Sequence, residues 1–72
     1  MNKITWRAEG NSGFLNGQRE ACTVRAAVRA ARKYIRTELG GEGSLVIYVD
    51  GEAVREDSRT IFTGYRWKVI NI

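Results

Sequence analysis

Short hydrophobic and polar segments alternate along the chain and are separated by turns that contain glycine. Residues 3–9 (KITWRAE) alternate apolar and polar side chains, which predicts a strand with one buried face. Residues 44–50 (SLVIYVD) contain an unbroken apolar run, which is typical of a strand in the middle of a sheet. The pair Asp50-Gly51 then predicts a tight hairpin, because a type I′ turn needs positive φ angles at both of its central residues.

The second half of this predicted hairpin differs in character from the first. Residues 52–62 (EAVREDSRTIF) are mostly polar and charged, and we expect them to form a sheet edge shielded by charge. Residues 65–72 (YRWKVINI) alternate again, which predicts a closing strand with one face in the core and cations on the other. The predicted core side chains are Tyr65, Trp67 and Val69, and the predicted solvent-facing cations are Arg66 and Lys68.

Between these strands lies the clearest helical pattern of the chain, at residues 24–39. Thr23 is the expected N-cap, because a helix that extended back to Glu20 would place that carboxylate on the apolar face. Gly40 is the expected left-handed residue that ends the helix. Apolar side chains recur at helical spacing and predict the face that packs on the sheet. These residues are Val24, Val28, Ala31, Ile35 and Leu39.

A second stripe of the same helix carries positive charge. Its members are Arg25, Arg29, Arg32 and Arg36, with Lys33 just beside them. Like charges one turn apart should cost the helix on the order of 1 kcal/mol. Two interpretations fit. The stripe is either a solvated face, whose arginines could pair with acidic residues elsewhere in the fold, or a surface that docks onto a polyanion. The acidic residues that could serve as such partners are Glu9, Glu42, Glu52, Glu56 and Asp57.

Composition adds limits to this picture. Seventy-two residues predict a single domain over residues 1–72. The pattern predicts an α+β fold with one helix packed on a three- or four-stranded, mainly antiparallel sheet, in the order β-(β)-α-β-β-β. The parentheses mark residues 12–22, which predict either a short strand or an irregular segment that leads into the helix. The lone Cys22 and the absence of histidine and of an apolar leader favour a cytoplasmic protein without a metal site.

The charge balance and the lack of reactive groups predict a binding protein without catalytic residues, cofactor, small-molecule substrate or membrane partner. The formal net charge is +4, which favours nucleic acid or an acidic protein surface as partner. The candidate binding residues are Arg25, Arg29, Arg32, Lys33, Arg36, Arg66 and Lys68. One hypothesis is a binder of nucleic acid or of a ribonucleoprotein complex. The other is a protein-only module, either an inhibitor or adaptor that binds an acidic patch or a homodimer joined through its sheet edge.

With its single helix, its antiparallel sheet and a last strand that contains Arg66-Trp67, the chain resembles small basic accessory proteins of phages and prophages, including some anti-CRISPR proteins. The resemblance covers the general layout and this one dipeptide. It implies inhibition of a host complex by occupation of a surface, often its nucleic-acid channel.

Overall fold

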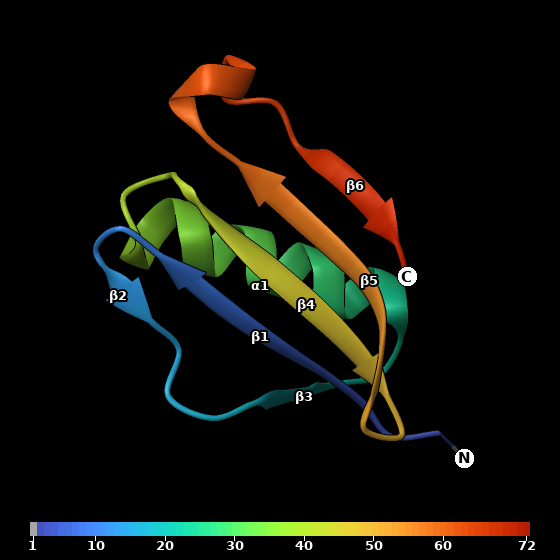
Figure 1. Cartoon of the computed structure of the whole chain (residues 1–72). Helices are drawn as coiled ribbons and strands as arrows, with labels where there is room; N and C mark the ends of the chain where they lie inside the picture. Colours follow the sequence, from blue (N-terminus) through green and yellow to red (C-terminus); the bar gives the residue numbers. More distant parts are fainter. Residues whose placement is uncertain (1) are drawn as a thin grey trace.

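A computed structural model describes residues 2–72 and shows one helix packed against one antiparallel sheet (Figure 1). The elements follow one another along the chain as β1 (Ile4–Gly10), β2 (Gly13–Phe14), β3 (Arg19–Ala21), α1 (Val24–Glu38), β4 (Gly43–Val49), β5 (Glu52–Arg59), the 3₁₀ turn η1 (Ile61–Thr63) and β6 (Lys68–Asn71). The α+β class and the single helix predicted from the sequence are therefore confirmed.

The sheet is larger than the predicted three or four strands. It has six strands among the described residues, in the order β2-β1-β4-β5-β6, with β3 pairing with the same strand β1 that holds β2. Both extra strands come from residues 12–22, where two short strands flank an irregular segment. Strands of two and three residues carry too few alternating positions for the periodicity to show them in the sequence.

Helix α1 begins and ends close to where its capping residues predict. The Oγ1 atom of Thr23 accepts a hydrogen bond from the Ala26 amide at 3.0 Å, which satisfies one of the unpaired donors of the first turn. Leu39 is the C-cap, and Gly40 follows with a φ of 73°, the left-handed conformation that glycine adopts without steric cost.

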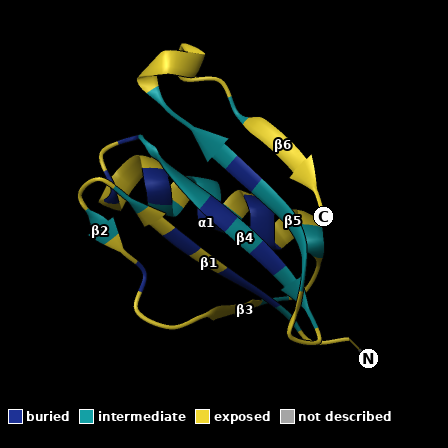
Figure 2. Cartoon of the chain, viewed as in Figure 1, coloured by how far each residue is buried: buried dark blue, intermediate teal, exposed yellow. Residues whose placement is uncertain are grey.

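The core lies between α1 and the two strands β1 and β4. Alternate side chains of both strands point at the helix, and these form the buried stripes visible in Figure 2. The helix contributes its predicted apolar face, of which Val24 alone is only partly buried. The buried apolar residues are Trp6, Ala8, Leu15, Ala27, Val28, Ala31, Ile35, Leu39, Leu45 and Ile47.

Strands β4 and β5 form the predicted hairpin. Asp50 and Gly51 have φ angles of 53° and 83°, as the type I′ turn requires. The expectation that the charged segment after this turn forms a sheet edge is wrong, because β5 pairs with β4 on one side and with β6 on the other. Its charged side chains have an internal role, described below.

The last strand, β6, forms the edge instead, and it is exposed along its length (Figure 2). Of the three aromatic and aliphatic residues expected in the core, Trp67 alone packs against it, and only in part. Tyr65 and Val69 remain 48% and 46% exposed. The physical reason is that α1 packs on β1 and β4 and therefore leaves the inner face of β6 largely uncovered.

Candidate anion-binding groove

A groove runs beside helix α1 on the side that faces β5 and β6. Its lining consists of Arg25, Val28, Arg29, Arg32, Arg36 and Trp67. The four arginines of the predicted stripe therefore do gather on one side of the helix, because steps of four, three and four residues return to the same face. No acidic side chain among residues 2–72 lines this groove.

Arg32 differs from the other three arginines because it is bound to a buried carboxylate. Its Nε and Nη2 atoms donate to Oδ2 of Asp57 at 2.9 and 2.7 Å. Arg55, two residues before Asp57 on β5, donates from Nε to Oδ1 at 2.8 Å and from Nη2 to Oδ2 at 3.1 Å. The Asp57 side chain is fully buried, whereas those of Arg32 and Arg55 are 31% and 27% exposed.

This cluster shifts the ionisation of its members. Burial by itself raises the pKa of Asp57, but the hydrogen bonds from Arg55 and Arg32 outweigh it, so the pKa of Asp57 is lowered. The hydrogen bond to Asp57 in turn raises the pKa of Arg55. Asp57 is therefore held as a carboxylate, and one positive charge remains on the cluster of one acid and two arginines.

Trp67 closes the groove through its contacts with two guanidinium groups. The Cζ atom of Arg32 lies 4.8 Å from the centre of the Trp67 ring, and that of Arg59 lies 5.6 Å from it. Both distances fall within the range of cation–π attraction. A nucleotide base that stacked on Trp67 would have to compete with these arginines, so we assign the ring a structural role that holds the start of β6 against α1.

Three arginines of the groove keep their charge available. Arg25, Arg29 and Arg36 are exposed, and none of them forms an ion pair with any residue of the described chain. Within the described chain, Arg32 therefore has an internal counter-charge, whereas the other three arginines of the stripe have none. Asp57 is one of the five acidic residues that the sequence offers as internal partners of the stripe.

The remaining candidate residues lie outside the groove. Lys33 is exposed and borders a separate depression on the other flank of α1, together with Trp6 and Tyr34. Arg66 is exposed in the segment between η1 and β6. Lys68 pairs with Ser58 in the sheet register, and the alternation of β6 points its side chain to the face opposite α1.

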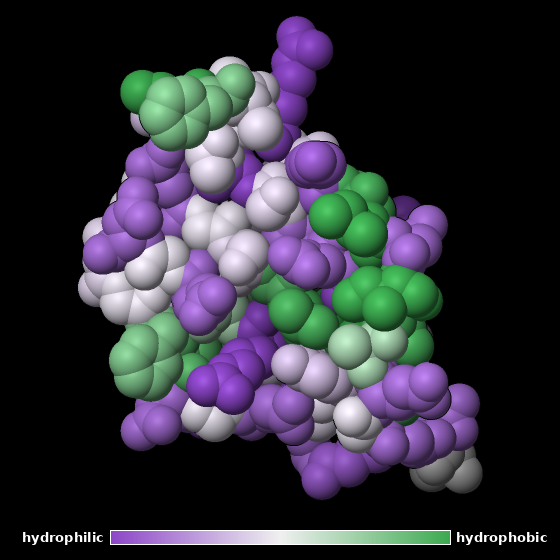
Figure 3. Space-filling view, viewed as in Figure 1, coloured by the Kyte–Doolittle hydropathy of each residue, from purple (hydrophilic) through white to green (hydrophobic). Residues whose placement is uncertain are grey.

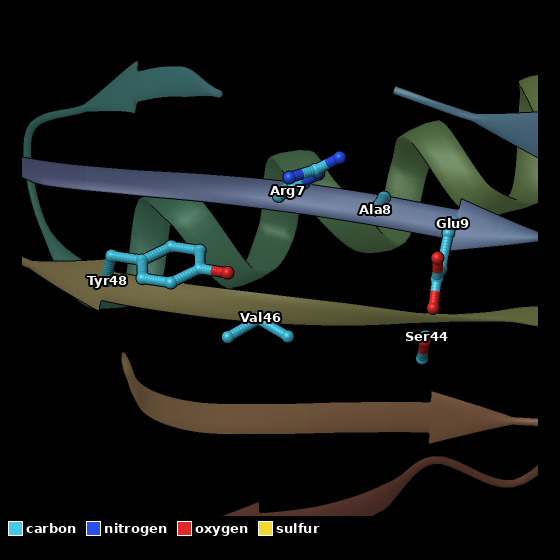
Figure 4. Close-up of a pocket in the computed structure, with 6 residues that line it drawn as sticks. All are labelled: Arg7, Ala8, Glu9, Ser44, Val46 and Tyr48. Carbon is cyan, nitrogen blue, oxygen red and sulfur yellow. The ribbon is translucent and has the colours of Figure 1, made fainter. Parts of the chain in front are cut away.

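That opposite face of the sheet has a shallow depression of its own (Figure 4). Arg7 and Glu9 of β1 and Ser44, Val46 and Tyr48 of β4 surround it, and the Glu9 side chain extends over β4 toward Ser44. One positive and one negative charge leave this depression with no net charge. Among residues 2–72 no three potential metal-ligating side chains come together, and Cys22 is an exposed free thiol.

The sequence pattern predicts neither the hydrogen bonds of Arg55 to Asp57 nor the place of Trp67 in the groove, and it indicates Asp57 only as one of several possible acidic partners. A signal for the cluster was present in β5, where Arg55, Asp57 and Arg59 alternate with other residues and so share one face of the strand. That spacing indicates a charged inner face once the strand is known to lie beside the helix.

A scan against models of protein families, a search of curated proteins and a search of solved structures each gave no significant match. Within the described part of the chain, no helix has the length and apolar character needed to cross a membrane.

Proposed function

We propose that the protein is a non-catalytic binding module whose groove beside α1 holds a polyanion, and that this polyanion is nucleic acid. The observation that carries the proposal is the set of three exposed arginines on one ridge, Arg25, Arg29 and Arg36, without an ion-pair partner in the described chain. The ridge spans about 16 Å of helix, from the rise of about 1.5 Å per residue.

The energetics of the helix support a binding role. Arg25 and Arg29 lie one turn apart and repel each other, and the first turn contains no acidic residue to offset them. A helix built only to cover the core would gain stability from a glutamate at either position. Phosphate groups in the groove would replace the repulsion with charge-assisted hydrogen bonds.

The side chains in the groove favour recognition of the phosphate backbone over recognition of bases. In the described part of the chain no asparagine or glutamine lines the groove, and the Trp67 ring is already contacted by arginines. Contacts to phosphate fix position but carry no sequence information. We therefore expect binding that is largely indifferent to nucleotide sequence.

Salt dependence tests this proposal quantitatively. Three arginine–phosphate contacts give a slope of about −2.7 for duplex DNA and about −2.1 for a single strand on a log–log plot of affinity against salt. Affinity should thus fall about 40-fold for duplex and about 20-fold for single strands between 50 and 200 mM salt. Fluorescence anisotropy with labelled duplex DNA, single-stranded DNA and RNA measures it.

A matched pair of double variants assigns the binding to the groove. Arg25→Glu with Arg29→Glu should abolish binding. Arg7→Glu with Arg19→Glu makes the same change in net charge at exposed residues outside the groove, and should retain most of the affinity. Equal losses in both variants would show that general charge, and not the groove, attracts the nucleic acid.

Absence of binding to all three probes at low salt would contradict the nucleic-acid proposal. Capture of one acidic protein that survives nuclease treatment would then favour the protein-only alternative. The inhibitory role implied by the resemblance to phage accessory proteins stays a prediction, and an assay for it needs the partner first.

A further inference from the structure

The outer edge of β6 has unpaired backbone groups. The Ile72 amide donates to the Val54 carbonyl oxygen at 3.1 Å, and alternate residues of an antiparallel strand direct their backbone groups to the same neighbour. Ile70 and Lys68 therefore face β5 with their backbone groups. Val69 and Asn71 direct theirs away from the sheet, where no further strand of the described chain lies.

Exposed apolar side chains gather along this same edge. Ile70 and Ile72 are 42% and 66% exposed, and Figure 3 shows hydrophobic atoms on the side of the molecule where Figure 1 places β6 and the C-terminus. Natural proteins usually protect such an edge with charge, proline or a covering segment. Here Lys68 is the one charged residue within β6.

The opposite edge of the sheet is protected. There β2 and β3 have only two and three residues, and β3 contains Arg19 and Glu20. Short and charged edge strands discourage pairing with another chain. The exposed template for pairing is therefore confined to β6.

We propose that β6 pairs antiparallel with β6 of a second copy of this chain, around a twofold axis that passes between the two Ile70 residues. In this register Val69 of each copy lies opposite Asn71 of the other. The outward backbone groups of both residues then form four hydrogen bonds within the limits of the two strands.

In this register the side chains of β6 fit those of β6 in the second copy. Ile70 meets its own counterpart, and Lys68 lies opposite Ile72 of the second copy, so that the aliphatic part of the lysine covers the isoleucine. The two Lys68 residues are four strand positions apart, about 14 Å, which exceeds the Debye length of about 8 Å at physiological salt. Because the two lysines are far enough apart not to repel each other strongly, the edge can pair with an identical strand and needs no acidic strand of another protein. This favours a second copy of the chain as the occupant.

The size of the contact sets the expected strength. Pairing of two strands this short buries less than the about 1,200 Å² of a standard stable interface. We therefore expect a reversible dimer with a dissociation constant in the micromolar range. If the twofold axis of the dimer is perpendicular to the sheet, both α1 helices lie on the same side of the joined sheet. The two cationic grooves then face each other across β5 and β6 of both copies.

Sedimentation equilibrium without nucleic acid tests the dimer independently of the proposed function. The apparent mass should rise from monomer to dimer between low micromolar and near-millimolar concentration. Ile70→Lys places two lysines in direct opposition and should weaken the dimer at least tenfold. Phe62→Lys, at a residue that is 96% exposed on η1, is the matched control and should leave the dimer unchanged. Equal effects of the two variants would overturn the proposal.

Cysteine cross-linking tests the register. In a Cys22→Ser background, Ile70→Cys should oxidise to a covalent dimer, because directly opposed residues of this kind have Cα atoms about 4.5 Å apart. Val69→Cys, at a residue of similar exposure, should not, since diagonal neighbours lie about 7–8 Å apart. Preferential cross-linking at Val69 would overturn the register.

Amide hydrogen exchange gives a readout that does not depend on a variant. The Val69 and Asn71 amides should gain protection as the protein concentration rises. If the chain stays monomeric and both amides exchange freely at every concentration, the proposal is overturned, and the edge is left for a strand of another protein.

Discussion

The buried carboxylate of Asp57 gives the sharpest test of how the fold is held together. Asp57→Asn removes the negative charge while nearly preserving the shape of the side chain. In the wild-type protein Arg32 and Arg55 together donate four hydrogen bonds to Asp57. In the variant the two arginines face one neutral acceptor oxygen and an NH₂ group that repels their own N–H donors.

The expected loss of stability is about 3 kcal/mol. Removing one partner of a buried ion pair typically costs about 3–5 kcal/mol, and the partial exposure of both arginines places this case at the lower end, because water can solvate their freed donors. A domain of this size rarely has more than about 3–5 kcal/mol of total stability. We therefore expect the variant to be largely unfolded at physiological temperature.

Urea denaturation followed by far-ultraviolet circular dichroism measures the effect. Glu56→Gln is the matched control, since it makes the same chemical change at the neighbouring residue, whose side chain lies on the other face of β5 and forms no ion pair in the described chain. We expect its free energy of unfolding to stay within about 0.5 kcal/mol of wild type. Equal stability of the two variants would refute the structural role assigned to Asp57.

Two further predictions follow from the same cluster. The pKa of Asp57 is lower in the folded state than in the unfolded state. Its contribution to stability is therefore complete above the unfolded pKa of about 3.9 and is lost as the pH falls through the lower folded pKa. The difference in unfolding free energy between wild type and Asp57→Asn should shrink below about pH 4, and urea titrations that show a constant difference would contradict this. Arg32→Glu should lower the melting temperature because it opposes Asp57 with a second carboxylate, whereas Arg29→Glu, one turn away, should leave it unchanged or raised by relief of repulsion; a shared response in thermal denaturation would contradict the assignment.

The fold could be predicted where local chemistry decides it. Thr23, Gly40 and the Asp50-Gly51 pair act through their own backbone and side-chain geometry, and the structure confirms each of them. The position of β5 could not be predicted in this way. Its charged residues suggest an edge when read alone, and only the presence of β6 beyond it makes it an interior strand.

The candidate site shows the same limit. Helical periodicity correctly brings Arg25, Arg29, Arg32 and Arg36 to one groove, because spacing along a helix fixes direction. The separation of Arg32 from the other three depends on Asp57, which is twenty-five residues further along the chain. No local sequence pattern predicts that these two residues form an ion pair. Local spacing also cannot show that α1 leaves β6 uncovered. The alternation of β6 therefore predicts a buried Val69, whereas the structure leaves this side chain exposed.

The ion pair between Arg32 and Asp57 also determines how many charges the groove offers to a ligand. A phosphate that drew Arg32 away would leave Asp57 with Arg55 as its one partner in the cluster. Each hydrogen bond that Arg32 gave up to this buried carboxylate contributes about 1.5–3 kcal/mol. A single exposed contact returns roughly 1 kcal/mol or less. Arg32 should therefore remain on Asp57 when nucleic acid binds, and the salt slope for duplex DNA should correspond to three phosphates, about −2.7, and not to four, about −3.6. A measured slope near the larger value would show that the pair opens on binding.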